Sequence, residues 1–120
     1  MNYHDLIRRI KDAASADEDE SQDALELVVE NVAAHLTDQT RREFAAALPD
    51  ELQNAAQMVP TANHIDESII EQLMDLEDVD ENSAKQRIRA AWQALCDIFD
   101  TSEVDDITAE LPHQVVAALE

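Results

Sequence analysis

The feature that most limits the fold of this chain is the complete absence of glycine from its 120 residues. Tight hairpin turns and β-bulges depend on glycine, because it adopts positive φ angles without a steric penalty. A glycine-free chain is therefore a poor candidate for a β fold. The chain instead holds 19 alanines, and alanine is the strongest helix former. The sequence predicts an all-α protein.

The length and composition are those of one ordinary domain, which we expect to span residues 1–120. Hydrophobic residues make up 45% of the chain, enough apolar material for a core. The single cysteine, Cys96, excludes an internal disulfide and is typical of a reducing compartment. No apolar run approaches the ~18 residues of a membrane span, and the charged start of the chain does not look like a signal peptide. We therefore expect a cytoplasmic protein without membrane association.

The chain is strongly acidic, with a formal net charge of -20 at pH 7. Its eight basic residues fall into three short clusters, so binding of nucleic acid through phosphate neutralisation is not expected. Three interpretations of the acid excess stay open. The surface could be adapted to high salt, it could simply keep a small protein soluble, or it could be a functional acidic surface. A functional surface would dock a basic partner or mimic DNA.

The chain contains an internal repeat. Placing each residue on the one 63 positions later aligns residues 1–57 with 64–120 without a gap and gives eight identities. The apolar positions match in order: Leu6 with Ile69, Ile10 with Leu73, Leu25 with Ile88, Val32 with Leu95, Leu36 with Phe99 and Phe44 with Ile107. We predict a helical bundle made of two tandem four-helix repeats, joined by a short connection at 58–63. The repeats should share one core, because about 57 residues is marginal for an independent domain.

Capping residues and apolar spacing predict the helices of each repeat. The first helices should span 3–14 and 65–77, with Leu76 on the apolar face of the second. The long helices should follow the N-caps Asp17 and Asp80. The third helices should open at Thr37 and Asp100, and the spacings Thr40–Glu43 and Asp100–Glu103 fit capping boxes. A Leu-Pro pair should end each third helix, with the proline in the first turn of a short fourth helix.

The two Leu-Pro segments carry a resemblance to a known family. They are Phe44–Leu52 (FAAALPDEL) and Ile107–Val115 (ITAELPHQV), each preceded by a long helix. With this pattern the chain resembles the bacterial and archaeal family of domains of unknown function numbered 2267, over nearly its whole length. The resemblance implies a duplicated helical fold. It implies no established activity and no catalytic residues.

One segment imitates the start of a calcium-binding loop. Asp78, Asp80 and Asn82 have the alternate spacing of such a loop. A functional loop also needs glycine at its sixth position and a bidentate glutamate at its twelfth. Ser83 and Arg89 occupy these positions. The acids are therefore interpreted as the capped start of a helix.

The histidines and the cysteine do not form a recognisable site. The four histidines, His4, His35, His64 and His113, lack the paired helical spacing of a metal centre. Cys96 has no base nearby in sequence to activate it and should fill space in the core. We expect no catalytic residues, no metal and no cofactor.

These observations favour a non-enzymatic protein–protein interaction or regulatory module. Its partner would be an unidentified protein, a basic one if the acidic surface is functional, and the oligomeric state stays open. The candidate partner contacts are the arginines Arg41, Arg42, Arg87 and Arg89, which would otherwise pair with surface acids. Two alternatives stay open: an acidic DNA mimic or sink for basic proteins, and a small-molecule binder or enzyme whose site the sequence does not reveal.

Overall fold

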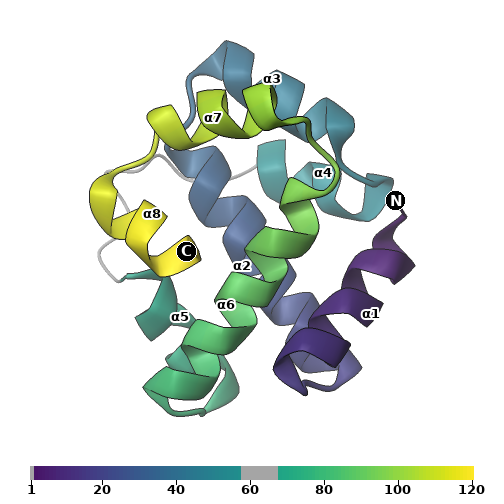
Figure 1. Cartoon of the computed structure of the whole chain (residues 1–120), viewed down its shortest axis with the longest axis vertical. Helices are drawn as coiled ribbons and strands as arrows, with labels where there is room; N and C mark the ends of the chain where they lie inside the picture. Colours follow the sequence, from purple (N-terminus) through teal and green to yellow (C-terminus); the bar gives the residue numbers. More distant parts are fainter. Residues whose placement is uncertain (1, 58–67) are drawn as a thin grey trace.

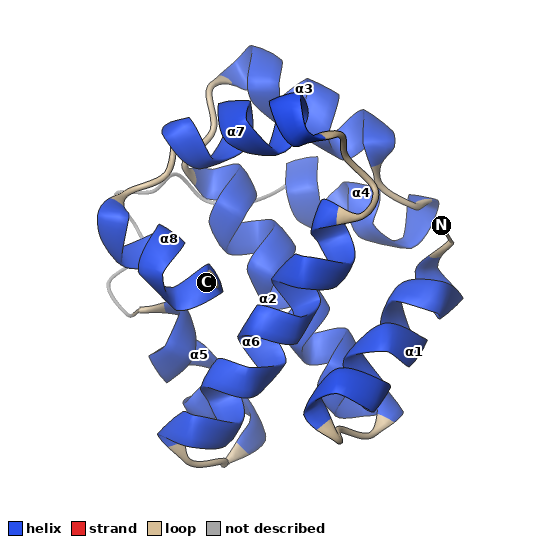
Figure 2. Cartoon of the chain, in the orientation of Figure 1, coloured by secondary structure: helices blue, strands red, loops and turns tan. Residues whose placement is uncertain are grey.

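A computed structural model describes residues 2–57 and 68–120. Within these residues the chain is helical and has no strand, which confirms the predicted all-α class (Figure 2). In chain order the helices are α1 (Tyr3–Ala14), α2 (Glu18–Ala34), α3 (Asp38–Ala47), α4 (Asp50–Gln57), α5 (Ile69–Glu77), α6 (Glu81–Cys96), α7 (Thr101–Ala109) and α8 (His113–Leu119).

Most helix starts are set by a polar side chain that accepts a backbone N–H of the first turn. These N-caps are Asn2, Asp17, Thr37, Ser68, Asp80 and Asp100. Each such cap typically stabilises a helix by about 1 kcal/mol. Asp17 with Glu20, and Asp100 with Glu103, complete capping boxes. The N-caps predicted at Asp17, Asp80, Thr37 and Asp100 are therefore confirmed.

Two predictions about helix starts are wrong. Thr40 and Glu43 do not form a capping box, because α3 already begins at Asp38 and Thr37 caps it. The prolines precede the fourth helices instead of entering their first turns. Pro112 is the N-cap residue of α8 with an extended ψ of 153°, and Pro49 lies just before α4.

The ends of α1 and α5 show how the chain manages without glycine. Ser15 and Asp78 follow these helices in the left-handed conformation, with φ of 52° and 53°. Glycine is the usual residue at this position. A side chain with a Cβ costs about 1–2 kcal/mol there, although aspartate tolerates it better than most residues.

The long helices α2 and α6 cross in the centre of the molecule, and the other helices surround them (Figure 1). α1 packs mainly on α6, and α5 packs on both α2 and α6. α4 lies against α2 and α8 against α6. α3 and α7 lie near each other at the top of the view in Figure 1.

One apolar cluster connects all of these helices. It draws residues from every helix from α1 to α8, with Leu25 and Val28 of α2 and Ile88 and Leu95 of α6 fully buried at its centre. Trp92 on α6 is also buried. The apolar stripes of α2 and α6 are buried, as the sequence predicts. Within each helix, a spacing of three and four residues places the apolar side chains on one face.

α5 differs from its predicted extent and face. It begins at Ile69 after its N-cap Ser68, and the predicted start at Ile65 lies outside the described residues. The sequence places Leu76 on the apolar face, but its side chain is 58% exposed. Leu76 lies in the last turn of the helix, which ends at Glu77.

Candidate functional site

A small hollow lies between α3 and α7, with acidic side chains around an apolar floor. Its volume is about 30 Å³. Three exposed carboxylates line it, Glu43 from α3 and Glu103 and Asp106 from α7. The floor holds Phe44 and Phe99, whose rings stack with centroids 5.5 Å apart and an interplanar angle of 13°. The hollow therefore combines negative charge with buried aromatic surface.

The carboxylate of Glu110 holds the two helices of this hollow together. Glu110 follows the last residue of α7 and accepts the Thr37 N–H at 2.7 Å and the Thr40 hydroxyl at 2.6 Å. Burial alone would raise the pKa of Glu110, but these hydrogen bonds to the ionised form outweigh it and lower the pKa below its usual value. An anion also suits this place because it lies at the N-terminus of α3.

The first predicted arginine pair divides into one engaged and one exposed residue. Arg41 is half-buried, and its Nε donates to the carbonyl of Ala33 at 3.0 Å. Its Nη2 donates to the carbonyl of Leu36 at 3.4 Å. Arg41 thus satisfies carbonyls at the C-terminal end of α2. Arg42 is exposed and lines an open surface hollow with Asp38, Arg41 and Gln57.

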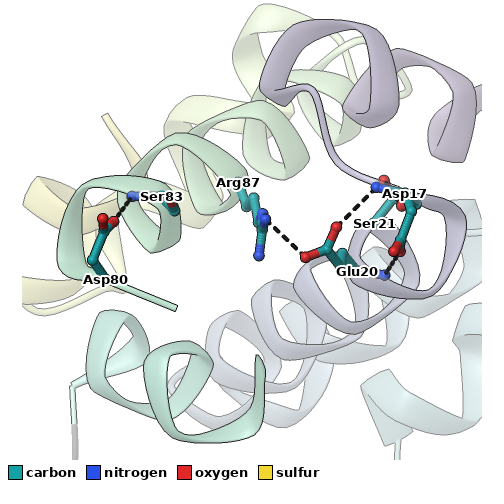
Figure 3. A network of polar contacts seen from close by, with 6 residues as sticks. All are labelled: Asp17, Glu20, Ser21, Asp80, Ser83 and Arg87. Atoms are coloured by element: carbon teal, nitrogen blue, oxygen red, sulfur yellow. Dashed lines mark hydrogen bonds and ion pairs between the residues drawn. The ribbon is translucent and has the colours of Figure 1, made fainter. Parts of the chain in front are cut away.

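The second predicted pair divides in the same way. The Nη2 of Arg87 lies 2.8 Å from Oε2 of Glu20, and only 11% of the Arg87 side chain is exposed. Figure 3 shows this side chain reaching from α6 toward the N-terminal turn of α2. Arg89 is exposed. The structure therefore separates the four arginines into two with intramolecular partners and two at the surface, and their role as partner contacts stays a prediction.

A pair of interacting carboxyl groups lies beside Arg87 and was not anticipated from the sequence. The pKa of Glu77 is raised to about 7, first by a side-chain hydrogen bond with Asp23 and then by burial and by the charges of Asp23 and Glu20. The charge of Arg87 acts in the opposite direction. No local motif could have revealed this pair, because its members belong to α2 and α5 and meet only in the folded chain.

The described histidines and acids are not arranged as a metal centre. His4 and His113 are exposed, and burial lowers the pKa of the half-buried His35. His64 lies outside the described residues. Among residues 2–57 and 68–120, no three or more His, Cys, Asp or Glu side chains are grouped so that they could hold a metal ion.

Asp80 and Cys96 have structural explanations. Asp80 accepts the Ser83 N–H as the N-cap of α6, and this hydrogen bond lowers its pKa. Cys96 is half-buried, and burial, together with the nearby Glu120, raises the pKa of its thiol to about 11. A thiol with so high a pKa carries almost no thiolate near neutral pH and is a poor nucleophile.

The acidic surface is spread over the molecule. Exposed carboxylates occur on each helix from α1 to α7, and they do not form a single row along one element. None of the helices in the described part of the chain is both long and apolar enough to cross a membrane.

Comparison with known proteins gives one match. A family model described as "Uncharacterized conserved protein (DUF2267)" matches residues 3–118, which confirms the resemblance carried by the two Leu-Pro segments. No curated protein and no solved structure matches the chain.

Proposed function

Because the chain belongs to the family of uncharacterized conserved proteins DUF2267, we propose its function from the chemistry of its described surface. The protein is a non-enzymatic module that binds a basic segment of a partner protein across α3 and α7. The partner places the cationic end of a lysine or arginine side chain at the mouth of the acidic hollow between these two helices. Its cytoplasmic location, expected from the single cysteine, belongs to the same proposal.

The observation that carries this proposal is the convergence of Glu43, Glu103 and Asp106 around one opening. Three carboxylates attract a cationic group from solution, and the attraction weakens as salt increases. The rings of Phe44 and Phe99 below them are almost fully buried, so the hollow would attract a lysine or arginine mainly through its negative charge. The position of Glu110 against Thr40 keeps both walls of the hollow in place.

The other candidate functions have weaker support. The acidic hollow of about 30 Å³ is far smaller than the roughly 300–1,000 Å³ of a typical small-molecule site. The two larger hollows of the described surface, about 400 and 530 Å³, are more open to solvent, which favours a protein partner over an enclosed small ligand or substrate. A DNA mimic needs carboxylates spaced like phosphates along one surface. The exposed acids are instead distributed over seven helices, α1 to α7.

The experiment measures binding of a synthetic lysine-rich helical peptide by calorimetry, at low salt and at ~1 M salt. The test variant is Glu43→Gln with Asp106→Asn, which removes two acids of the hollow. The matched control is Glu51→Gln with Asp105→Asn, which removes two exposed acids outside it. We expect the test variant to bind at least about tenfold more weakly and the control to change less than about twofold. Equal losses in both variants would mean that the peptide responds only to net charge.

We also propose that the fold consists of two tandem four-helix repeats, 1–57 and 64–120, that share one core as a single domain. In support, α2, α3 and α4 begin at residues 18, 38 and 50, and α6, α7 and α8 begin 63 residues later in each case. The two left-handed residues, Ser15 and Asp78, have the same offset. The packing is reciprocal as well, since α1 lies on α6 and α5 lies on α2.

A further inference from the structure

The outward face of α3 carries a base directly beside an acid. Six of the ten residues of this helix are exposed, and the other four are buried or half-buried. The exposed residues are Asp38, Gln39, Arg42, Glu43, Ala46 and Ala47. Because they follow one another at steps of four residues in two adjacent rows, they form one continuous face. α3 lies at the top of the molecule in Figure 1, and this face is open to solvent.

Arg42 has no acidic partner among the described residues, although the chain carries 28 acids. It belongs to none of the three ion pairs of that part of the structure. Asp38 lies one turn earlier and lines the same open hollow, yet the two side chains form no ion pair. The neighbouring Arg41 is already bound to carbonyl groups of α2. The charge of Arg42 is therefore available to a carboxylate of another molecule.

Glu43 presents the opposite charge at the next position of the helix. It is exposed, and its Oε1 accepts a long hydrogen bond of 3.5 Å from the amide of Gln39. Glu43 also lines the acidic hollow together with Glu103 and Asp106 of α7. A cationic group that binds Glu43 therefore lies at the mouth of this hollow, where all three carboxylates attract it.

The exposed face of α3 is complementary to itself. A two-fold axis through the middle of the helix, between Arg42 and Glu43, places two copies of α3 side by side and antiparallel. Each exposed residue then faces the exposed residue at the same distance from the axis. Arg42 faces Glu43 of the second copy, Gln39 faces Ala46, and Asp38 faces Ala47. The two-fold dimer is the commonest assembly of identical chains, and a second copy of this chain fits the face.

We propose that α3 forms the interface of a symmetric dimer, in which Arg42 of each copy binds Glu43 of the other. This inference rests on the proposed function, because Arg42 of the second copy supplies the cationic group at the mouth of the acidic hollow. The partner of this site is thus a second copy of the chain. The contact forms twice, once on each side of the axis. Each arginine can bind its carboxylate through two parallel hydrogen bonds.

The side chains and the polarity of α3 suit this packing. Ala46 and Ala47 are the last two residues of the helix and are exposed. Because their side chains are small, the two helices can approach to about 8 Å, the short end of the usual range. The antiparallel arrangement also places the positive N-terminal end of each helix beside the negative C-terminal end of the other. Asp38, at the N-terminal end, faces an alanine and meets no like charge on the second α3.

The association should be weak. α3 has ten residues and is therefore about 15 Å long, so its interface is smaller than the roughly 1,200 Å² of a stable complex. Each copy also carries a net charge of -20, and two copies repel each other at low salt. At ~0.15 M salt this repulsion is screened beyond about 8 Å, whereas the contact between Arg42 and Glu43 is shorter and persists. We expect a Kd on the order of 0.1 mM under these conditions.

The test measures the average mass of the full chain by sedimentation equilibrium at ~0.15 M salt, from about 10 μM to about 1 mM protein. The mass should rise from that of one chain toward that of two. Arg42→Glu should weaken the association by at least about tenfold, because two pairs of like charges replace two ion pairs. Arg8→Glu is the matched control. It makes the same change of charge at an exposed arginine of α1, and it should change the association by less than about twofold.

A mixture of two variants tests the symmetry of the interface. The Arg42→Glu chain and the Glu43→Arg chain should each associate poorly alone, because like charges face each other across the axis. Mixed in equal amounts they should form a heterodimer, since each acid then faces a base, although both chains stay strongly acidic. Both positions are exposed, and circular dichroism checks that the variants fold. The interface is wrong if the mixture stays monomeric, or if Arg42→Glu weakens the dimer no more than Arg8→Glu does.

Binding of the lysine-rich peptide separates this inference from the proposed function. The Arg42→Glu chain keeps all three carboxylates of the hollow, so it should bind the peptide at least as tightly as the unchanged chain. If the peptide binds but the unchanged chain stays monomeric up to about 1 mM, the dimer is wrong and the proposed function stands. If the dimer forms as described but the peptide does not bind, the dimer stands and binding of a separate basic partner is wrong.

Discussion

The carboxylate of Glu110 accepts a hydrogen bond of 2.6 Å from the hydroxyl of Thr40, a residue 70 positions earlier in the chain. The same carboxylate accepts the N–H of Thr37, the N-cap residue of α3. A side chain that follows α7 therefore completes the N-terminus of α3. This contact fixes the relative position of the two helices that line the acidic hollow.

Glu110→Ala should lower the free energy of unfolding by about 1 kcal/mol near pH 7, the usual effect of losing a capping side chain. The pKa of Glu110 is lowered in the folded state, so its contribution is complete above the unfolded-state pKa and disappears as the pH falls through the folded-state pKa. Urea unfolding of the variant and the unchanged protein from pH 3 to pH 7 measures this. Asp105→Ala, on the exposed face of α7, is the control. A difference that persisted undiminished at pH 3 would contradict the assignment.

Arg41 and Arg42 should respond differently to the same substitution. Arg41→Ala removes two hydrogen bonds to carbonyls at the end of α2 and should cost about 1–2 kcal/mol. Arg42→Ala removes an exposed side chain and should change stability by less than about 0.5 kcal/mol. Thermal unfolding of both variants provides the comparison. If Arg42 contacts a partner as predicted from the sequence, Arg42→Glu should weaken that binding without loss of stability. Equal destabilisation by both alanine variants would show that Arg41 does not cap α2.

Ser15→Gly should stabilise the protein. Ser15 has a φ of 52°, where glycine avoids about 1–2 kcal/mol of steric cost but loses about 0.5–1 kcal/mol through its greater freedom when unfolded. A net gain of about 0.5–1 kcal/mol corresponds to a rise in Tm of roughly 2–4 °C. Differential scanning calorimetry measures the change. The control is Ser15→Ala, which keeps the Cβ and should leave Tm nearly unchanged. If Ser15→Ala raised Tm as much as Ser15→Gly does, relief of backbone strain could not be the cause of the stabilisation.

Neither half of the chain should fold alone. Residues 1–57 lack α6, on which α1 packs, and residues 64–120 lack α2, on which α5 packs. Circular dichroism during urea unfolding should show no cooperative transition for either fragment. An equimolar mixture should recover helicity, because the apolar cluster takes residues from both halves. A cooperative transition in one isolated fragment would show that this half has a core of its own.

Local chemistry explains why much of the fold could be predicted. Asp17 and Asp80 cap helices because their carboxylates reach backbone N–H groups only three residues away. The stripes of α2 and α6 follow the helical period. Leu76 fits the same period on α5 but is exposed, because periodicity places a residue on a helix face and does not say where the neighbouring helices end.

The sequence by itself determined that the chain is helical, where most helices begin, and which long stripes are buried. These properties depend on groups within about one turn of each other. Only the tertiary structure decided that Arg41 satisfies the end of α2, that Glu110 completes α3, and that Glu77 meets Asp23. The contacts of Glu110 and Glu77 join helices that are far apart in the chain. In all three contacts, the behaviour of a charged side chain depends on its packing. Packing decides which partners the side chain meets and how much water is removed from it.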